Sequence, residues 1–167
     1  MESGRTVATS GADETRAVGA ALAGLLRAGD VVLLVGSLGA GKTTLVQGLV
    51  AALGGDKPAT SPTFTLAHTY RTTPPVTHVD LWRLERLAEV VDLALEEVLD
   101  DGGVVVAEWG EAAEPLLGAG ALVVRIGWGP EQDERTITIE ARGTAWGSRA
   151  GLLTRALASC GAPAGGR

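Results

Sequence analysis

The sequence predicts an α/β fold, in which helices cover both faces of a mainly parallel β-sheet. Apolar runs without alternation, such as Val31–Val35 and residues 104–107, are typical of parallel strands that are buried on both faces. Segments with helical spacing of apolar residues separate these runs. Two later segments, 122–126 and 136–141, read as strands joined by a turn, which indicates an antiparallel edge on the sheet.

Length and composition fit one domain. The chain has 167 residues, of which 46% are hydrophobic and 20% charged, an ordinary balance for a globular protein. We expect a single domain at 5–160, a disordered start at 1–4 and a flexible tail at 161–167. No apolar run is long enough to span a membrane, no secretory signal is recognisable, and the lone Cys160 cannot form an internal disulfide. These features favour a cytoplasmic protein without membrane contacts.

The first element expected is a helix that starts near Ser10. Ser10 and Asp13 fit a capping box, in which their side chains accept hydrogen bonds from backbone N–H groups at the helix start. Gly29 is expected to end this helix before the strand at 31–35. One apolar stripe follows the helical period: Val18, Ala21, Leu22 and Leu25.

The remaining elements follow from apolar spacing and from breaks at glycine and proline. A helix is predicted from Lys42 to about Leu53, where two glycines stop it. Further along the chain we expect a loop leading into a strand at 60–70, a strand at 76–81, a helix at 86–99, a buried strand at 104–107, the strand pair, and a helix at 148–158.

Residues 36–43 read Gly-Ser-Leu-Gly-Ala-Gly-Lys-Thr and match the phosphate-loop pattern G-x-x-x-x-G-K-[ST] in full. Glycines permit backbone angles that a Cβ would block, so that N–H groups can surround phosphates at a helix N-terminus. Lys42 is expected to reach the β- and γ-phosphates, and the Thr43 hydroxyl to complete a Mg²⁺ shell. The fold is therefore expected to be a P-loop NTPase-like three-layer sandwich. The expected nucleotide-binding residues are Gly36, Gly39, Ala40, Gly41, Lys42, Thr43 and Thr44.

Two acidic residues stand where such a site needs them. Glu108 follows the strand at 104–107 and Asp80 follows residues 76–79, so both lie where a parallel sheet opens its ligand crevice. Asp100 begins a D-x-x-G sequence like that of GTPase switches, but it follows a helix rather than a strand and is discounted. No N-K-x-D guanine-reading motif occurs, which favours ATP over GTP.

The formal net charge of −6 argues against direct binding of nucleic acid. Proteins that bind nucleic acid unaided usually present a basic face, because neutralisation of phosphates drives that binding. If the protein serves nucleic-acid metabolism, another subunit is expected to hold the nucleic acid.

Four motifs resemble those of the TsaE family, also called YjeE. They are Gly-Ala-Gly-Lys-Thr-Thr at 39–44, Ser-Pro-Thr-Phe-Thr-Leu at 61–66, His-Val-Asp-Leu-Trp-Arg-Leu at 78–84 and Glu-Trp at 108–109. The resemblance implies a small bacterial ATPase needed to form the threonylcarbamoyl group on adenosine of tRNAs that read codons beginning with adenine. It also implies ATP and Mg²⁺ as cofactors and a complex of TsaD and TsaB as partner. That complex would contact the tRNA, and hydrolysis, slow in the isolated protein, would reset it.

The resemblance also implies roles for individual residues. Thr43 and Glu108 resemble the family's magnesium pair, Lys42 and Asp80 its catalytic residues, and Arg135 an arginine near the nucleotide. Two segments resemble switches that sense the γ-phosphate, and their residues are Ser61, Thr63, Thr65, Trp82, Arg83 and Trp109. The family usually has tyrosine where this chain has Trp82 and proline where it has Gly110, which leaves the details of the switch segments open.

Other interpretations stay open on the sequence alone. A small-molecule kinase would share the phosphate loop, although no cluster of arginines suggests a lid over ATP. A nucleotide-dependent binding module without essential hydrolysis would use the same residues. Ser61 could begin an ordinary turn, and Trp82 and Trp109 could be core or rim aromatics. His68 and His78 read as core histidines without a role, and Cys160 has no neighbouring base.

Overall fold

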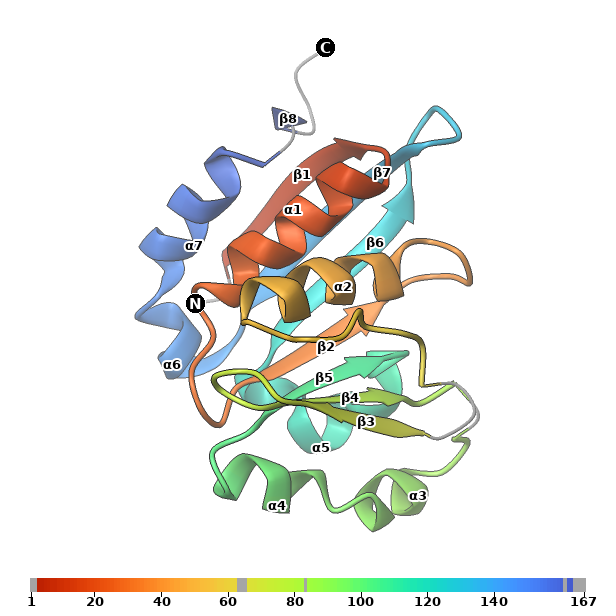
Figure 1. Ribbon diagram of the computed structural model, residues 1–167, viewed down its shortest axis with the longest axis vertical. Helices are drawn as coiled ribbons and strands as arrows, with labels where there is room; N and C mark the ends of the chain where they lie inside the picture. The colour runs from red at the N-terminus through yellow and green to blue at the C-terminus, as the bar shows by residue number, and fades with distance from the viewer. Residues whose placement is uncertain (1–2, 63–65, 83, 161, 164–167) are drawn as a thin grey trace.

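The computed structural model describes residues 3–62, 66–82, 84–160 and 162–163. In these residues eight strands form one sheet, with the order β3-β4-β5-β2-β6-β7-β1-β8 (Figure 1). The strands are β1 (Ser3–Ser10), β2 (Val31–Val35), β3 (Ala67–Tyr70), β4 (Val76–Asp80), β5 (Val104–Glu108), β6 (Leu122–Trp128), β7 (Glu134–Ala141) and β8 (Ala162–Pro163). The α-helices are α1 (Ala12–Ala23), α2 (Lys42–Ala52), α3 (Leu87–Asp92), α4 (Leu95–Asp100), α5 (Glu114–Leu117), α6 (Gly143–Gly147) and α7 (Ala150–Ala158), and two 3₁₀ turns are η1 (Gly110–Ala113) and η2 (Gly118–Gly120).

The centre of the sheet is parallel, as expected. Strands β4, β5, β2 and β6 pair in parallel, and β6 and β7 form the expected antiparallel pair. Antiparallel strands flank this centre on both sides, because β3 pairs with β4 and β1 pairs with β7. The sequence patterns did not indicate β1, whose residues are mostly polar and half exposed.

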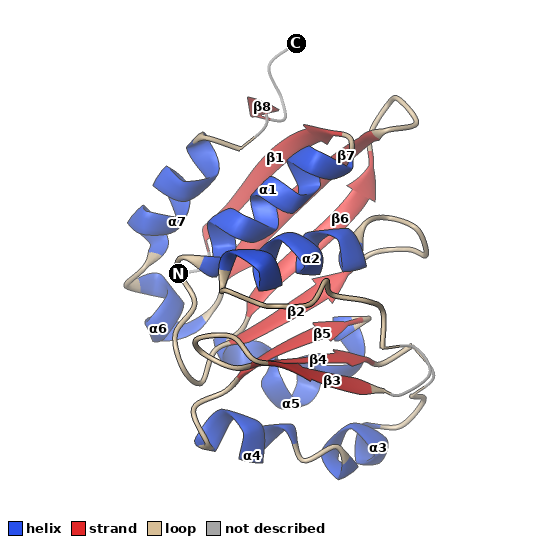
Figure 2. Cartoon of the chain, in the orientation of Figure 1, coloured by secondary structure: helices blue, strands red, loops and turns tan. Residues whose placement is uncertain are grey.

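The molecule has three layers, with helices on both faces of the sheet (Figures 1 and 2). In β2, Val32 and Leu34 pack into a core with α1, α2, α6 and α7, whereas Val31 and Leu33 pack into a second core with α3, α4 and the η1–α5 segment. Burial on both faces explains why this strand is uniformly apolar. The α/β sandwich predicted from the sequence is confirmed.

Helices α1 and α2 pack through two glycines. A Cβ at Gly19 would lie 2.0 Å from the carbonyl oxygen of Leu45, and a Cβ at Gly48 would lie 1.9 Å from that of Arg16. No larger residue fits at either position without moving a helix. Because α2 starts directly after the glycine-rich loop, this contact holds the helix that carries the loop.

The predicted start of the chain is wrong in two respects. Ser3 and Gly4, expected in a disordered start, pair with Ala141 and Glu140 of β7. The predicted capping box does not form, because Ser10 ends β1 and α1 has no side-chain cap. Instead, the Glu14 carboxylate accepts a hydrogen bond from the backbone N–H of Ser10. At the other end, part of the expected tail forms the short strand β8 against β1.

One predicted helix is interrupted. The helix expected at 86–99 forms as α3 and α4, separated at Ala94, whose φ of 54° is left-handed. The helix expected at 148–158 is confirmed as α7, which begins at Ala150 after the short helix α6. Arg149, between α6 and α7, turns its side chain inward to Asp30 and is 2% exposed. None of the helices in the described part of the chain combines the length and apolar character needed to cross a membrane.

Candidate functional site

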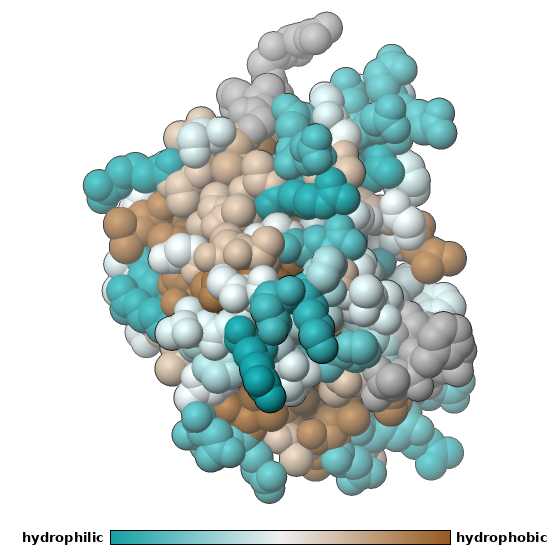
Figure 3. All heavy atoms as spheres, viewed as in Figure 1, coloured by the Kyte–Doolittle hydropathy of each residue, from teal (hydrophilic) through white to brown (hydrophobic). Residues whose placement is uncertain are grey.

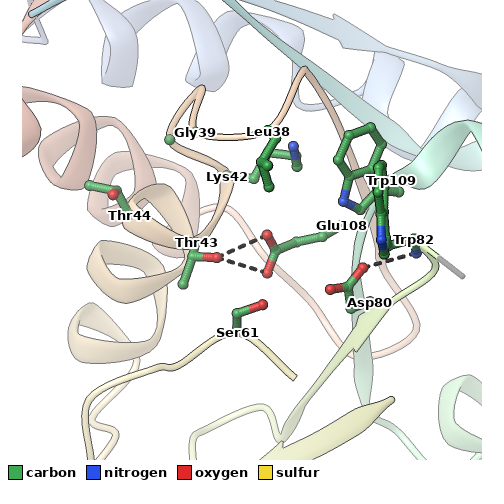
Figure 4. Close-up of a pocket in the computed structure, with 11 residues that line it drawn as sticks. Leu38, Gly39, Lys42, Thr43, Thr44, Ser61, Asp80, Trp82, Glu108 and Trp109 are labelled. Carbon is green, nitrogen blue, oxygen red and sulfur yellow. Dashed lines mark hydrogen bonds between the residues drawn. The ribbon is translucent and has the colours of Figure 1, made fainter. Parts of the chain in front are cut away.

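A cavity of about 370 Å³ lies where β2, β4 and β5 end and α2 begins (Figure 4). Among the described residues, its lining brings together four separate segments of the chain, and Leu38 is the one of these lining residues that was not among the predicted site residues. The predicted residues that line it are Gly39, Gly41, Lys42, Thr43, Thr44, Ser61, Asp80, Trp82, Glu108 and Trp109.

The loop that joins β2 to α2 requires its three glycines. Gly39 has a φ of 79° and Gly41 a φ of 113°, left-handed values that favour glycine. A Cβ at Gly36 would lie 2.7 Å from the carbonyl oxygen of Ile126 on β6. The loop therefore curves into the N-terminus of α2, an arrangement that directs N–H groups towards an anion.

Lys42 is buried at the start of α2 and lies against its own loop. Its Nζ donates to the carbonyl oxygens of Gly36 at 2.6 Å and Ser37 at 3.0 Å. It also lies 4.0 Å from the ring centroid of Trp109. Burial lowers the pKa of Lys42, while the charges of Glu108, Glu111 and Asp80 act in the opposite direction. The ammonium group of Lys42 therefore lies at the rim of the loop.

The predicted magnesium pair is in direct contact. The Thr43 hydroxyl donates to the Glu108 carboxylate, at 2.9 and 3.1 Å from its two oxygens (Figure 4). The same carboxylate lies 2.6 Å from Nε2 of His78. Because its hydrogen is directed at Glu108, the Thr43 oxygen keeps its lone pairs for a cation.

Asp80 lies beside Glu108, since the two residues are in register on β4 and β5. Its Oδ1 accepts the backbone N–H of Trp82 at 2.9 Å. The ring of Trp82 lies 4.4 Å from that of Trp109, centroid to centroid, and Trp82 is 53% exposed (Figure 4). An acidic residue and an aromatic pair therefore border the cavity opposite the loop.

The first switch-like segment is only partly described. Ser61 lines the cavity, whereas Thr63 and Thr65 lie outside the described residues, as does Arg83 of the second segment. Leu66, with a left-handed φ of 65°, accepts the backbone N–H of Asp80 through its carbonyl oxygen at 3.0 Å. The end of this segment is thus hydrogen-bonded to Asp80.

Arg135 contacts the phosphate loop but does not line the cavity described above. Its Nε donates to the carbonyl oxygen of Ala40 at 3.0 Å, and its guanidinium lies 3.8 Å from the ring centroid of Trp128. Arg135 and Ala40 border a second cavity of about 180 Å³, which shares Gly39, Gly41 and Thr44 with the first.

Sequence reasoning missed two contacts of the site. It gave His78 no role, although the alternation of side chains along a strand places His78 on the same face of β4 as Asp80. It also passed over Trp128, whose Nε1 donates to the Ser37 hydroxyl at 3.1 Å. The spacing His-x-Asp could have revealed the first contact; no local pattern points to the second.

The donors at the site suit magnesium. Thr43, Glu108 and Asp80 offer oxygen atoms, the ligands that Mg²⁺ prefers. Among the described residues no group of three or more His, Cys, Asp and Glu side chains could hold a metal by itself. Mg²⁺ at nucleotide sites is usually held by one or two protein oxygens together with water and phosphate, which is consistent with the few protein donors here.

The chain is similar to known proteins in both sequence and structure. A family model described as threonylcarbamoyl adenosine biosynthesis protein TsaE matches residues 9–137. The tRNA threonylcarbamoyladenosine biosynthesis protein TsaE of Streptomyces coelicolor is 45% identical over 138 residues, 78% of this chain and 93% of that protein. The protein of the same name from Bacillus subtilis is 38% identical over 132 residues, 78% of this chain and 82% of that protein.

A solved structure supports the same grouping. The crystal structure of Bacillus subtilis YdiB matches with a TM-score of 0.77 and 31% sequence identity, over 93% of this chain and 97% of that chain. The family match spans every described residue of the site, from Gly36 to Arg135.

Proposed function

The chain belongs to the TsaE family, and on this premise we propose that it is a magnesium-dependent ATPase that serves the formation of threonylcarbamoyladenosine in tRNA. The observation that carries the proposal is the contact of Thr43 with Glu108 beside the phosphate loop. That contact joins a phosphate-binding loop to an acidic strand end, the pairing that nucleotide hydrolysis with Mg²⁺ uses.

The loop residues bind the phosphates of ATP. Backbone N–H groups of the loop and the positive N-terminus of α2 attract them. Lys42 exchanges the carbonyl oxygens of Gly36 and Ser37 for phosphate oxygens, and a full negative charge is the stronger acceptor for an ammonium group. We assign the rest of the nucleotide to the second cavity, beside Arg135, because that cavity shares Gly39, Gly41 and Thr44 with the first.

Thr43 and Glu108 would hold the magnesium ion. Magnesium held there would supply positive charge that neutralises the phosphates. The Thr43 hydroxyl donates its hydrogen to Glu108, so the carboxylate fixes the direction of the hydroxyl, whose oxygen would be available to the ion.

Asp80 orients the attacking water, and Lys42 stabilises the charge of the transition state. Asp80 is suited to this role because it lines the same cavity as Lys42 and is held by the backbone N–H of Trp82. A carboxylate so held accepts a hydrogen bond from water in a defined direction.

We propose TsaD and TsaB as the partners, with the tRNA held by them rather than by this acidic chain. Exposed apolar side chains near the site support a partner surface. On the phosphate loop the side chain of Leu38 is 78% exposed, and that of Trp82 is 53% exposed. On α3, which follows Trp82 in the chain, Leu87 is 44% exposed and Val91 is 53% exposed. Figure 3 shows apolar surface over α3 and α4. Hydrolysis then resets the complex, and contact with it speeds hydrolysis.

Reconstitution of the modification tests the proposal. TsaD, TsaB, tRNA and a threonylcarbamoyl donor are combined with and without the full chain, and product turnovers per complex are counted. We expect many turnovers with the chain and ATP, and about one per complex without it. Equal turnovers in both reactions would refute the proposed role.

A further inference from the structure

His78 makes a contact that the proposed mechanism does not use. It is completely buried on β4, and its Nε2 lies 2.6 Å from Oε2 of Glu108. We infer that His78 is a positioning residue for the metal: it holds the Glu108 carboxylate in the orientation that, with Thr43, receives magnesium. This inference rests on the proposed function and adds a residue to it.

The hydrogen bond has a defined direction. An ionised carboxylate only accepts hydrogen bonds, so Nε2 of His78 carries the hydrogen and donates it to Glu108. The other ring nitrogen, Nδ1, is buried and has no hydrogen-bond partner among the described residues. Among the described residues, Glu108 is therefore the hydrogen-bond partner of the buried His78 ring.

Strand geometry explains how His78 reaches this carboxylate. His78 and Asp80 are two residues apart on β4, so their side chains share one face, and Asp80 is in register with Glu108 on β5. His78 thus approaches Glu108 from the interior of the sheet, while Thr43 approaches it from α2. The ring of Tyr70 on β3 lies 6.3 Å from that of His78.

The carboxylate is held from two directions for a physical reason. A glutamate side chain has three rotatable bonds, and it loses this rotational freedom when its carboxylate binds a metal in one orientation. Hydrogen bonds from Thr43 and His78 remove it before any ligand arrives. Outer partners of this kind strengthen metal binding because they orient the inner ligand.

The test measures metal binding directly, using the full chain with ADP. Mn²⁺ replaces Mg²⁺ because its free and bound forms are distinguished by electron paramagnetic resonance. His78→Gln keeps an N–H donor near the position of Nε2, whereas the amide of His78→Asn is too short to reach Glu108. We expect His78→Asn to weaken Mn²⁺ binding about 10- to 100-fold and His78→Gln to restore most of it. ADP binding in EDTA should be the same in both variants and the parent.

His68→Asn is the matched control. His68 lies opposite His78 in the register of β3 and β4 and is half-buried, so the same substitution one strand away should leave Mn²⁺ binding unchanged. Parental Mn²⁺ affinity in His78→Asn would overturn the inference and leave the proposed function standing. If His78→Asn does not fold, loss of Mn²⁺ binding in His78→Gln with ADP binding intact would overturn it as well. A parent protein that binds no Mn²⁺ with ADP would overturn the proposed function itself.

Discussion

Thr43 and Glu108 are 65 residues apart in the chain, yet the Thr43 hydroxyl lies 2.9 Å from Oε1 of Glu108. The contact exists because β2 and β5 are parallel neighbours, so that the loop after β2 and the end of β5 open at the same edge. Helix α2 then turns Thr43 towards the end of β5.

Substitution of Thr43 should separate loss of the hydroxyl from loss of packing. Thr43→Val keeps the shape of the side chain but removes the oxygen that we assign to magnesium, and we expect hydrolysis to slow by on the order of 100-fold. Thr43→Ser keeps the hydroxyl and should stay within about threefold of the parent rate. The measurement is phosphate release as a function of Mg²⁺ concentration. A Thr43→Val protein as active as Thr43→Ser would contradict the assignment.

The central sheet and the loop were predictable because each carries its own local signal. The strand at 31–35 is apolar on both faces, and the loop at 36–43 has glycines at the positions where left-handed angles or close approach demand them. Strand β1 carries no such signal, because its stability comes from pairing with β7, far away in the chain. The predicted capping box does not form for the same reason, because Ser10 pairs with β7 as the last residue of β1.

The acidic residues of the site were found because a strand end is visible in the sequence, but their hydrogen bonds were not. The contact of His78 with Glu108 depends on which strands are neighbours, and the tilted ring contact of Trp82 with Trp109 depends on the loops that follow them. Similarly, the break at Ala94 is set by packing of α3 and α4 on the sheet rather than by local helix spacing.

The glycine contact between α1 and α2 predicts a loss of stability. Gly19→Ala would place a methyl group 2.0 Å from the carbonyl oxygen of Leu45, so the helices must separate. We expect the free energy of unfolding to fall by about 1–3 kcal/mol, the usual cost of overpacking. Gly147→Ala is the control, since a Cβ at Gly147 meets no atom within 4 Å. Urea denaturation of both variants provides the comparison, and equal stability of the two would show that the helices adapt without cost.

The buried pair of Arg149 and Asp30 should matter for stability and not for the site. Arg149 donates to both carboxylate oxygens of Asp30, at 2.6 and 2.8 Å, and to the carbonyl oxygen of Leu25. Arg149→Met leaves the Asp30 charge buried without its partner, which should lower the free energy of unfolding by about 3–5 kcal/mol. Adding Asp30→Asn should recover part of the loss. Nucleotide affinity, measured well below the melting temperature, is expected to be unchanged, and a specific loss of it would contradict a purely structural role.

Substitution of Asp80 tests whether ATP hydrolysis is required for the function of the protein or is a by-product of nucleotide binding. Asp80→Asn keeps an oxygen that can accept the N–H of Trp82, so the local backbone should be preserved. It removes the negative charge that we propose orients water, and hydrolysis should fall by on the order of 100-fold while ATP binding stays. Fluorescent-nucleotide binding, phosphate release and tRNA modification with TsaD and TsaB are measured on the same preparation. If hydrolysis falls and repeated turnover of the modification falls with it, ATP cleavage drives the cycle. If modification continues at the parental rate, the chain acts as a nucleotide-dependent binding module, and the proposed role of hydrolysis is wrong.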